Sequence, residues 1–305
     1  MTVPDDVRFP PTLGYQVVDV FTGTAYAGNP LAVVLDADEL STGQLQALAR
    51  EFNLSETAYP MVATDRADYR LRIFTPSVEL PFAGHPSVGA AWLLHSLGRL
   101  PAGDVVQSCG AGRLAVTVTA DGAMLTGGPP CWGDGLDPGP LLDAVGLTAG
   151  DLVVGVAPRW CGAGLDFGYL LVHPGALARA RPDQARLAVL GGAGVSVTAW
   201  DGRSARSRVF AGGVGVVEDP ATGSAALGLG VLLAVSGLLP DGGTAYDVVQ
   251  GVELGRPSLL SCTVEVAGGL PVRTTVRGQV VPVARGEIRV PPPPSPPIME
   301  LVPPR

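Results

Sequence analysis

Apolar and polar residues alternate along the first half of the chain in a way that predicts short strands separated by helices. The predicted strands of this half run over residues 15–21, 31–35, 58–63, 70–74 and 114–119. A helix capped by Ser41 follows the second strand, and its apolar residues recur at three- and four-residue spacing: Leu45, Leu48, Ala49 and Phe52. A second, almost uncharged helix is predicted over 90–97.

The second half repeats the same kind of pattern. Its predicted strands run over 169–172, 195–200, 206–210 and 259–266, with a final pair of strands over 272–276 and 280–283. A helix is predicted over 182–190. From Pro291 onward the segment P-P-P-P-S-P-P predicts an extended, disordered tail, because proline supports neither helix nor sheet hydrogen bonding.

The longest uncharged run, over 220–240, begins within the stretch E-D-P-A-T-G-S at 218–224. An acidic pair, a proline and a Gly-Ser step before an apolar run predict a tight turn and then a buried helix. The free N–H groups in the first turn of such a helix attract a carboxylate or a phosphate. This stretch is therefore a candidate anion site.

A second copy of this arrangement lies upstream. Placing Gly84 over Gly223 gives an offset of 223 − 84 = 139, and the other pairs at that offset are Glu79/Glu218, Pro81/Pro220, Gly89/Gly228, Leu93-Leu94/Leu232-Leu233 and Gly98/Gly237. A Gly-rich composition alone aligns some glycines, but it does not account for the Glu, Pro and Leu-Leu pairs. The repeat predicts two similar halves, each with strands around one buried apolar helix, and a cleft between two helix N-termini.

Glycine and proline crowd together between 127 and 140, which marks the boundary between the halves. We therefore predict an N-terminal repeat domain over 12–128, a C-terminal repeat domain over 129–290 and the Pro-rich tail over 291–305. A chain of 305 residues with 47% hydrophobic and 16% charged residues has ample material for two cores.

Composition narrows the classes of function. The net charge of −8 and the scattered basic residues argue against a nucleic-acid surface. The N-terminus lacks a basic region followed by an apolar one. Thr, Gly and Ser interrupt the longest uncharged run, and its apolar part is too short to span a bilayer, so we expect a soluble cytoplasmic protein. Four widely spaced cysteines and three unpaired histidines do not support a metal site or a disulfide framework.

The positions at which the two copies differ indicate candidate catalytic residues. His85 follows Gly84 where Ser224 follows Gly223, and Asp219 stands where the first half has Leu80. With Glu56, from the segment N-L-S-E-T at 53–57, these residues form a candidate acid–base set. Each also has a purely structural explanation: a carboxylate at a helix end, a cap, a turn donor or an N-terminal serine. Glu79 and Glu218, which both copies share, are expected to be supporting residues.

Four motifs, in order along the chain, resemble those of the phenazine-biosynthesis PhzF-like isomerases. They are N-L-S-E-T (53–57), L-P-F-A-G-H-P (80–86), E-D-P-A-T-G-S-A (218–225) and Q-G-x-x-x-G-R-P-S (250–258), and F-T-G-T-A-Y-A-G-N-P-L-A-V-V (21–34) fits as well. The resemblance implies an α+β, diaminopimelate-epimerase-like fold with two pseudo-symmetric domains, and usually a homodimer. It also implies that Glu56 is the acid/base, that His85, Asp219 and Ser224 surround the substrate, and that no metal or organic cofactor is needed.

The leading hypothesis is therefore a cofactor-independent isomerase of a small carboxylated, unsaturated ring, such as the family's type substrate 2,3-dihydro-3-hydroxyanthranilate or another secondary-metabolite intermediate. Backbone at Gly84 and Gly223 is expected to help bind the substrate. The residues expected to set specificity from the cleft wall are Tyr26, Asn29, Ser77 and Gly213.

Two alternatives stay open at this point: an epimerase or racemase of an amino or hydroxy acid, and a non-catalytic relative that binds a ligand. Related racemases use one cysteine per half, whereas Gly84 and Asp219 stand at those positions here. The missing cysteines disfavour a two-thiol racemase, and the retained acid–base set disfavours a non-catalytic relative.

Overall fold

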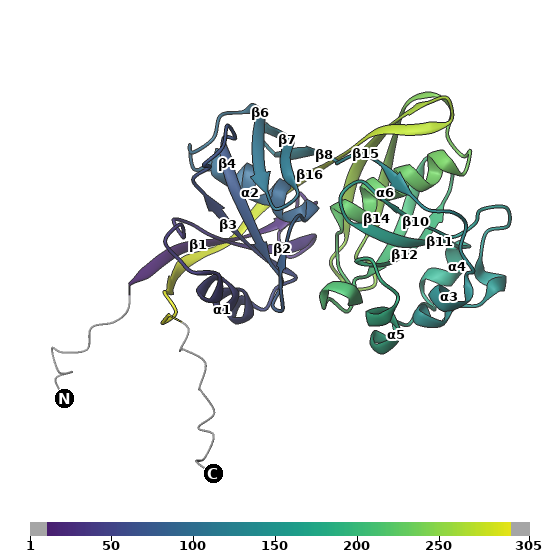
Figure 1. Ribbon diagram of the computed structural model, residues 1–305, viewed down its shortest axis with the longest axis horizontal. Coiled ribbons are helices and arrows are strands. Elements are labelled where there is room, and N and C mark those ends of the chain that lie inside the picture. The colour runs from purple at the N-terminus through teal and green to yellow at the C-terminus, as the bar shows by residue number, and fades with distance from the viewer. Residues whose placement is uncertain (1–10, 294–305) are drawn as a thin grey trace, which may run out of the picture.

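A computed structural model describes residues 11–293, and it shows two lobes, each with strands around one long apolar helix (Figure 1). The elements of the first lobe are β1 (Thr12–Val20), β2 (Asn29–Val34), α1 (Thr42–Phe52), β3 (Glu56–Met61), β4 (Tyr69–Phe74), β5 (Glu79–Leu80), α2 (Gly84–Ser96), β6 (Gly103–Cys109), β7 (Gly112–Thr119) and β8 (Gly122–Thr126). The predicted tail beyond residue 293 lies outside the described residues.

The second lobe contains the remaining elements. They are β9 (Cys131–Trp132), α3 (Gly139–Val145), η1 (Ala149–Asp151), β10 (Arg159–Gly162), β11 (Asp166–Leu171), α4 (Pro174–Leu177), α5 (Gln184–Val189), β12 (Gly194–Trp200), β13 (Ser204–Phe210), η2 (Gly212–Val214), α6 (Gly223–Val235), β14 (Gly242–Gln250), β15 (Ser258–Ala267) and β16 (Leu270–Arg289). Within the described residues, no helix is long and apolar enough to cross a membrane.

The central helices α2 and α6 have apolar residues all round because strands cover them on several sides. α2 packs on β1, β2, β3, β7, β8 and β16, and α6 packs on β10, β11, β15 and β16. The other helices lie outside the strands: α1 covers β3 and β4, and α3, α4 and α5 cover the outer face of β11–β13. A buried helix cannot be amphipathic, which is why α2 and α6 lack the single apolar stripe that α1 shows.

The predicted final pair of strands is wrong, because β16 is one continuous strand of 20 residues. It pairs first with β15, then with β8 and finally with β1, so it runs from the second lobe into the first (Figure 1). Gly278 does not form a turn, because it pairs with Ala123 of β8 within the strand, and the ring of Phe21 occupies the space that a side chain there would need. The predicted domain limits stay a prediction, and the second part of β16 lies against the first lobe.

The internal repeat is visible in matching ion pairs. Arg72 makes two hydrogen bonds of 2.7 Å to Glu79, and Arg208 makes bonds of 2.8 and 2.7 Å to Glu218. Each guanidinium also lies over a phenylalanine ring two residues along the strand, at 5.1 and 5.0 Å. These equivalent contacts show that the shared glutamates support the fold.

Candidate active site

A small cavity lies where the two lobes meet, at the N-termini of both central helices. It is lined by Glu56, Leu80, Ala83, Gly84, His85, Leu165, Phe167, Ala193, Ala211, Val216, Asp219, Thr222, Gly223 and Ser224. The space inside it for water-sized molecules is about 20 Å³, enough for roughly one water. A larger hollow of about 400 Å³ lies between Phe21, Leu259 and Arg277, but its lining contains none of the candidate acid–base residues. We therefore place the candidate site in the smaller cavity.

The contact between the two helices explains the paired glycines. A Cβ on Gly84 would lie 2.9 Å from the Cα of Gly223, closer than side-chain carbons approach a backbone. The residues before the helices, Ala83 and Thr222, make no side-chain cap to the helical N–H groups. Two positive helix ends therefore converge on one cavity, and this arrangement favours an anion.

Glu56 is the first residue of β3 and follows Asn53, whose left-handed conformation ends α1. The residue is 8% exposed, and its Oε2 has no hydrogen-bond partner within the described structure. Burial raises the pKa of this carboxyl well above its ordinary range, and the neighbouring charge of Asp219 raises it further. Both effects favour the protonated form of Glu56 over the carboxylate.

His85 is the second residue of α2, and only 2% of its surface is exposed. Its Nδ1 lies 3.4 Å from Glu56 Oε2, and its Nε2 has no partner among the described residues. Burial lowers the pKa of this imidazole to about 3, so the ring is neutral at neutral pH. A neutral ring exchanges hydrogen bonds without adding charge to the site.

Asp219 comes from the other lobe, directly before the turn into α6. Its Oδ1 accepts a hydrogen bond from Asn29 Nδ2 (2.8 Å), and its Oδ2 accepts one from the Thr222 hydroxyl (2.6 Å). Burial raises the pKa of Asp219 to about 6, while the hydrogen bonds from Thr222, Asn29 and Ser55 oppose the rise. Of the two carboxyl groups, Asp219 accepts hydrogen bonds at both oxygens, whereas Glu56 Oε2 has no hydrogen-bond partner among the described residues.

The cavity brings together most of the predicted site residues: Glu56, His85, Asp219, Gly84, Gly223 and Ser224. Asn29 lies directly behind them, fully buried, and donates to both Asp219 and the carbonyl of Ala221. Its position in β2 means that these hydrogen bonds join the two lobes.

Three residues predicted for the cleft wall do not line the cavity. Tyr26 is 74% exposed on the loop after β1, and Gly213 lies in η2, where its backbone packs against Gly192. Ser77 is exposed in the turn between β4 and β5, beside Gly215 of the other lobe. All three residues lie near the site motifs in the sequence, but nearness in sequence does not determine the direction in which a loop faces.

Sequence reasoning missed the apolar wall of the site, which comes from Leu165, Phe167, Ala193, Ala211 and Val216. These residues lie on different elements, and no local pattern connects them. It also missed Thr222 and Gln250, although both stand inside quoted motifs. A polar residue three positions after Asp219 was the available signal for Thr222.

Comparison with known proteins gives a consistent result. A family model described as "Phenazine biosynthesis-like protein" matches residues 18–286. A trans-2,3-dihydro-3-hydroxyanthranilate isomerase from Pseudomonas aeruginosa is 36% identical over 279 residues, which cover 89% of this chain and 98% of that protein. The enzyme of the same name from Pseudomonas fluorescens is 34% identical over 282 residues, covering 90% and 98%.

Solved structures show the same fold. A phenazine biosynthesis protein of the PhzF family from Bacillus anthracis superposes with a TM-score of 0.80 at 23% identity, covering 91% of this chain and 99% of that one. A predicted epimerase from Pseudomonas aeruginosa gives 0.76 at 35% identity, covering 90% and 99%. A probable proline racemase from Agrobacterium radiobacter gives 0.65 at 13% identity, covering 92% and 94%, which shows the fold alone. The predicted α+β, epimerase-like fold is confirmed.

Proposed function

The chain belongs to the family of phenazine biosynthesis-like proteins, and from this premise we propose that it is an isomerase that moves a proton and a double bond within a small carboxylated, unsaturated ring. The relatives named trans-2,3-dihydro-3-hydroxyanthranilate isomerase support a substrate of that kind.

One observation carries the proposal: Glu56 Oε2, His85 Nε2 and Asn29 Oδ1 are all buried without a hydrogen-bond partner among the described residues. An unsatisfied buried polar atom costs about 1–3 kcal/mol. Two of the three residues line one cavity and the third lies against it. A ligand carrying amino, hydroxyl and carboxylate groups would satisfy such a set.

The proposed reaction needs one group that both removes and returns a proton. Glu56 first releases its own proton to the solvent, and its carboxylate then takes a proton from a ring carbon. The electrons of that C–H bond form a new double bond, and the existing double bond shifts. Its far carbon then takes the proton back from Glu56, so that product and substrate are isomers. A buried carboxylate with a raised pKa is both a stronger base and an acid matched to neutral pH.

The surrounding groups have complementary roles in this proposal. The first turns of α2 and α6 hold the substrate carboxylate, because no cationic side chain lines the cavity. The Asp219 carboxyl group and the neutral His85 exchange hydrogen bonds with the amino and hydroxyl groups. The apolar wall of Leu165, Phe167 and Val216 packs against the ring and limits the access of water.

An epimerase of an amino or hydroxy acid is the second candidate. Glu56 and Asp219 come from opposite lobes, so the two carboxyl groups approach the cavity from two sides, as an acid and a base on opposite faces of a stereocentre would. The structural neighbour named as a predicted epimerase points the same way. The conventional two-thiol form finds no support, since no cysteine lines the cavity.

Assembly, compartment and cofactor use remain proposals that follow from the family. We propose a cytoplasmic homodimer whose only ligand is a small carboxylated molecule and which uses no metal or organic cofactor. Within residues 11–293, no group of three His, Cys, Asp or Glu side chains is placed to hold a metal ion. Light scattering during size-exclusion chromatography would give about twice the chain mass of 31.1 kDa for a dimer and contradict the proposal at the monomer mass.

The test of function is turnover of trans-2,3-dihydro-3-hydroxyanthranilate by the wild-type chain and by Glu56→Gln, which keeps the side-chain shape and removes the base. We expect the double bond to shift with the wild type and kcat to fall by about 10²–10⁴-fold or more in the variant. The matched control is Glu51→Gln, which alters an exposed glutamate of α1. Binding without turnover by the wild type would instead support a non-catalytic relative.

A further inference from the structure

Two buried glutamines occupy equivalent places in the two lobes. Gln107 lies near the end of β6 and Gln250 at the end of β14, in the strands that follow the two central helices. Both are almost completely buried. Neither touches the cavity, and the proposed chemistry uses neither of them.

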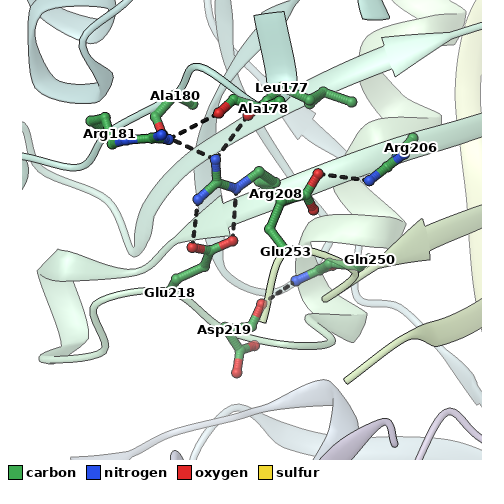
Figure 2. Close-up of polar contacts among 10 residues, drawn as sticks. All are labelled: Leu177, Ala178, Ala180, Arg181, Arg206, Arg208, Glu218, Asp219, Gln250 and Glu253. Carbon is green, nitrogen blue, oxygen red and sulfur yellow. Dashed lines mark hydrogen bonds and ion pairs between the residues drawn. The ribbon is translucent and has the colours of Figure 1, made fainter. Parts of the chain in front are cut away.

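Gln250 is connected to the candidate acid. Its Nε2 donates to the backbone carbonyl of Asp219 at 2.7 Å (Figure 2) and to the Thr222 hydroxyl oxygen at 2.9 Å. Its Oε1 accepts the Thr222 backbone N–H at 3.2 Å. Both amide hydrogens of Gln250 are therefore used, and this fixes the direction of the hydrogen bond between the Thr222 hydroxyl and Asp219.

Because the Thr222 oxygen receives a hydrogen from Gln250, its own hydrogen is directed to Asp219 Oδ2, 2.6 Å away. Asn29 donates to the other carboxylate oxygen. Asp219 thus accepts hydrogen bonds at both oxygens, as an ionised carboxylate does and a protonated one does less well.

The backbone of Asp219 is also fixed. Its N–H donates to the carbonyl of Val209 at 2.9 Å, and the preceding Glu218 is held by Arg208, which also donates to the carbonyls of Leu177 and Ala180 (Figure 2). The other titratable groups facing the carboxylate are Glu56 from β3 and His85 from α2.

Gln107 has different partners in the first lobe. It donates to the Ser87 hydroxyl at 3.0 Å and accepts from the Tyr69 hydroxyl at 2.8 Å. At the positions equivalent to Asp219 and Thr222, this lobe has Leu80 and Ala83, whose side chains form no hydrogen bonds. The same structural glutamine therefore supports an acid in one lobe only.

We propose that Thr222 and Gln250 are positioning residues for Asp219: their directed hydrogen bonds hold its carboxylate as an acceptor and assign the proton shared by the two facing carboxyl groups to Glu56. The role of this arrangement in catalysis rests on the proposed function. Both carboxyl groups line one cavity, and the charge of Asp219 disfavours a second charge on Glu56, so the donors around Asp219 decide which group holds the proton.

The test is a titration of the full-length chain with ¹³C-labelled side-chain carboxyl groups, followed by NMR, with Asp219→Asn used to assign the signal. Thr222→Val removes the donor but keeps the shape, and Thr222→Ser keeps the donor. A hydrogen bond to a charged group contributes about 1.5–3 kcal/mol, so we expect Thr222→Val to raise the proton affinity of Asp219 by roughly 10- to 100-fold. Thr222→Ser should restore the wild-type titration.

Gln250→Leu should move the Asp219 titration in the same direction, whereas the matched control Gln107→Leu should not move it. An unchanged Asp219 titration in Thr222→Val, or an equal shift in Gln107→Leu, would overturn the proposal. If Thr222→Val does not fold, Thr222→Ala provides the same comparison. The titration uses no substrate, so a wild-type chain that fails to isomerise the ring would count against the proposed function alone.

Discussion

At the scale of single residues, the burial of Glu56 links catalysis to stability. The folded state holds a proton on this carboxyl at pH values where the unfolded chain has released it. The native state then binds more protons than the unfolded state. The contribution of Glu56 to the free energy of unfolding is therefore fully present near pH 4 and is lost as the pH rises through the raised pKa. The group that makes a strong base also destabilises the fold above that pH.

Glu56→Gln should therefore stabilise the protein while it inactivates it. The neutral amide keeps the shape and needs no proton, so we expect Tm of the variant to exceed that of the wild type at pH 8 and to match it near pH 4. Calorimetry across this pH range would measure the difference. A variant less stable than the wild type at pH 8 would mean that folding does not raise the pKa of the Glu56 carboxyl.

At the scale of secondary-structure elements, the contact between the starts of α2 and α6 is the most constrained point of the site. A Cβ on Gly84 would meet only backbone atoms of Gly223 and Ser224, at 2.9 to 3.0 Å, and these cannot rotate away. We expect Gly84→Ala to cost about 1–3 kcal/mol of unfolding free energy and to lower kcat by moving both helix starts.

The matched control for Gly84→Ala is Gly243→Ala in β14, where a Cβ would have no neighbour within 4 Å. This exposed substitution should change stability by no more than about 0.5 kcal/mol. Urea denaturation of both variants would make the comparison. Equal stability of the two variants would show that the helix starts are not in tight contact.

The helices and strands that the sequence predicts agree with the structure only where the prediction depends on neighbouring residues. α1 has the Ser41 cap and the apolar face that the sequence predicted, and α6 begins at the predicted Gly-Ser step. Both predictions depended only on neighbouring residues. The continuity of β16 could not be read from the sequence, since Gly278 in a strand resembles a glycine in a turn. The strands β6 and β8 were not predicted, because β6 begins with Gly103-Asp104 and has no regular alternation of apolar and polar residues, and β8 has only five residues.

The site residues could be predicted where the two copies of the repeat differ, and not where they depend on distant segments. His85, Asp219, Ser224 and Glu56 stood out because the two copies differ there, and the resemblance to the family added the acid/base role of Glu56. The apolar wall and the position of Ser77 depend on how the two lobes meet, which no local pattern records.

At the scale of the whole molecule, the cavity is too small for the proposed ring, so the lobes must separate to admit it. Ser77 of the first lobe and Gly215 of the second lie together, with the Ser77 Cβ 3.9 Å from the place of a Cβ on residue 215. That distance suits a disulfide. We expect the double variant Ser77→Cys, Gly215→Cys to lose turnover on oxidation and to regain it with a reductant.

Each single cysteine variant is the control for this cross-link, since the chain already contains four free cysteines and Gly215 has a left-handed backbone. The single variants should keep the same activity in oxidant and reductant. Full turnover by the oxidised, cross-linked protein would contradict the requirement that the lobes separate.

In the proposed mechanism, the single carboxyl group of Glu56 removes and returns the same proton. The most direct measurement uses substrate deuterated at the carbon that loses its proton, with the product analysed by NMR after reaction in ordinary water. We predict that part of the deuterium appears at the far end of the new double-bond system, and that Glu56→Gln abolishes this transfer. Complete loss of deuterium to solvent, or transfer that persists without the Glu56 carboxylate, would contradict the account.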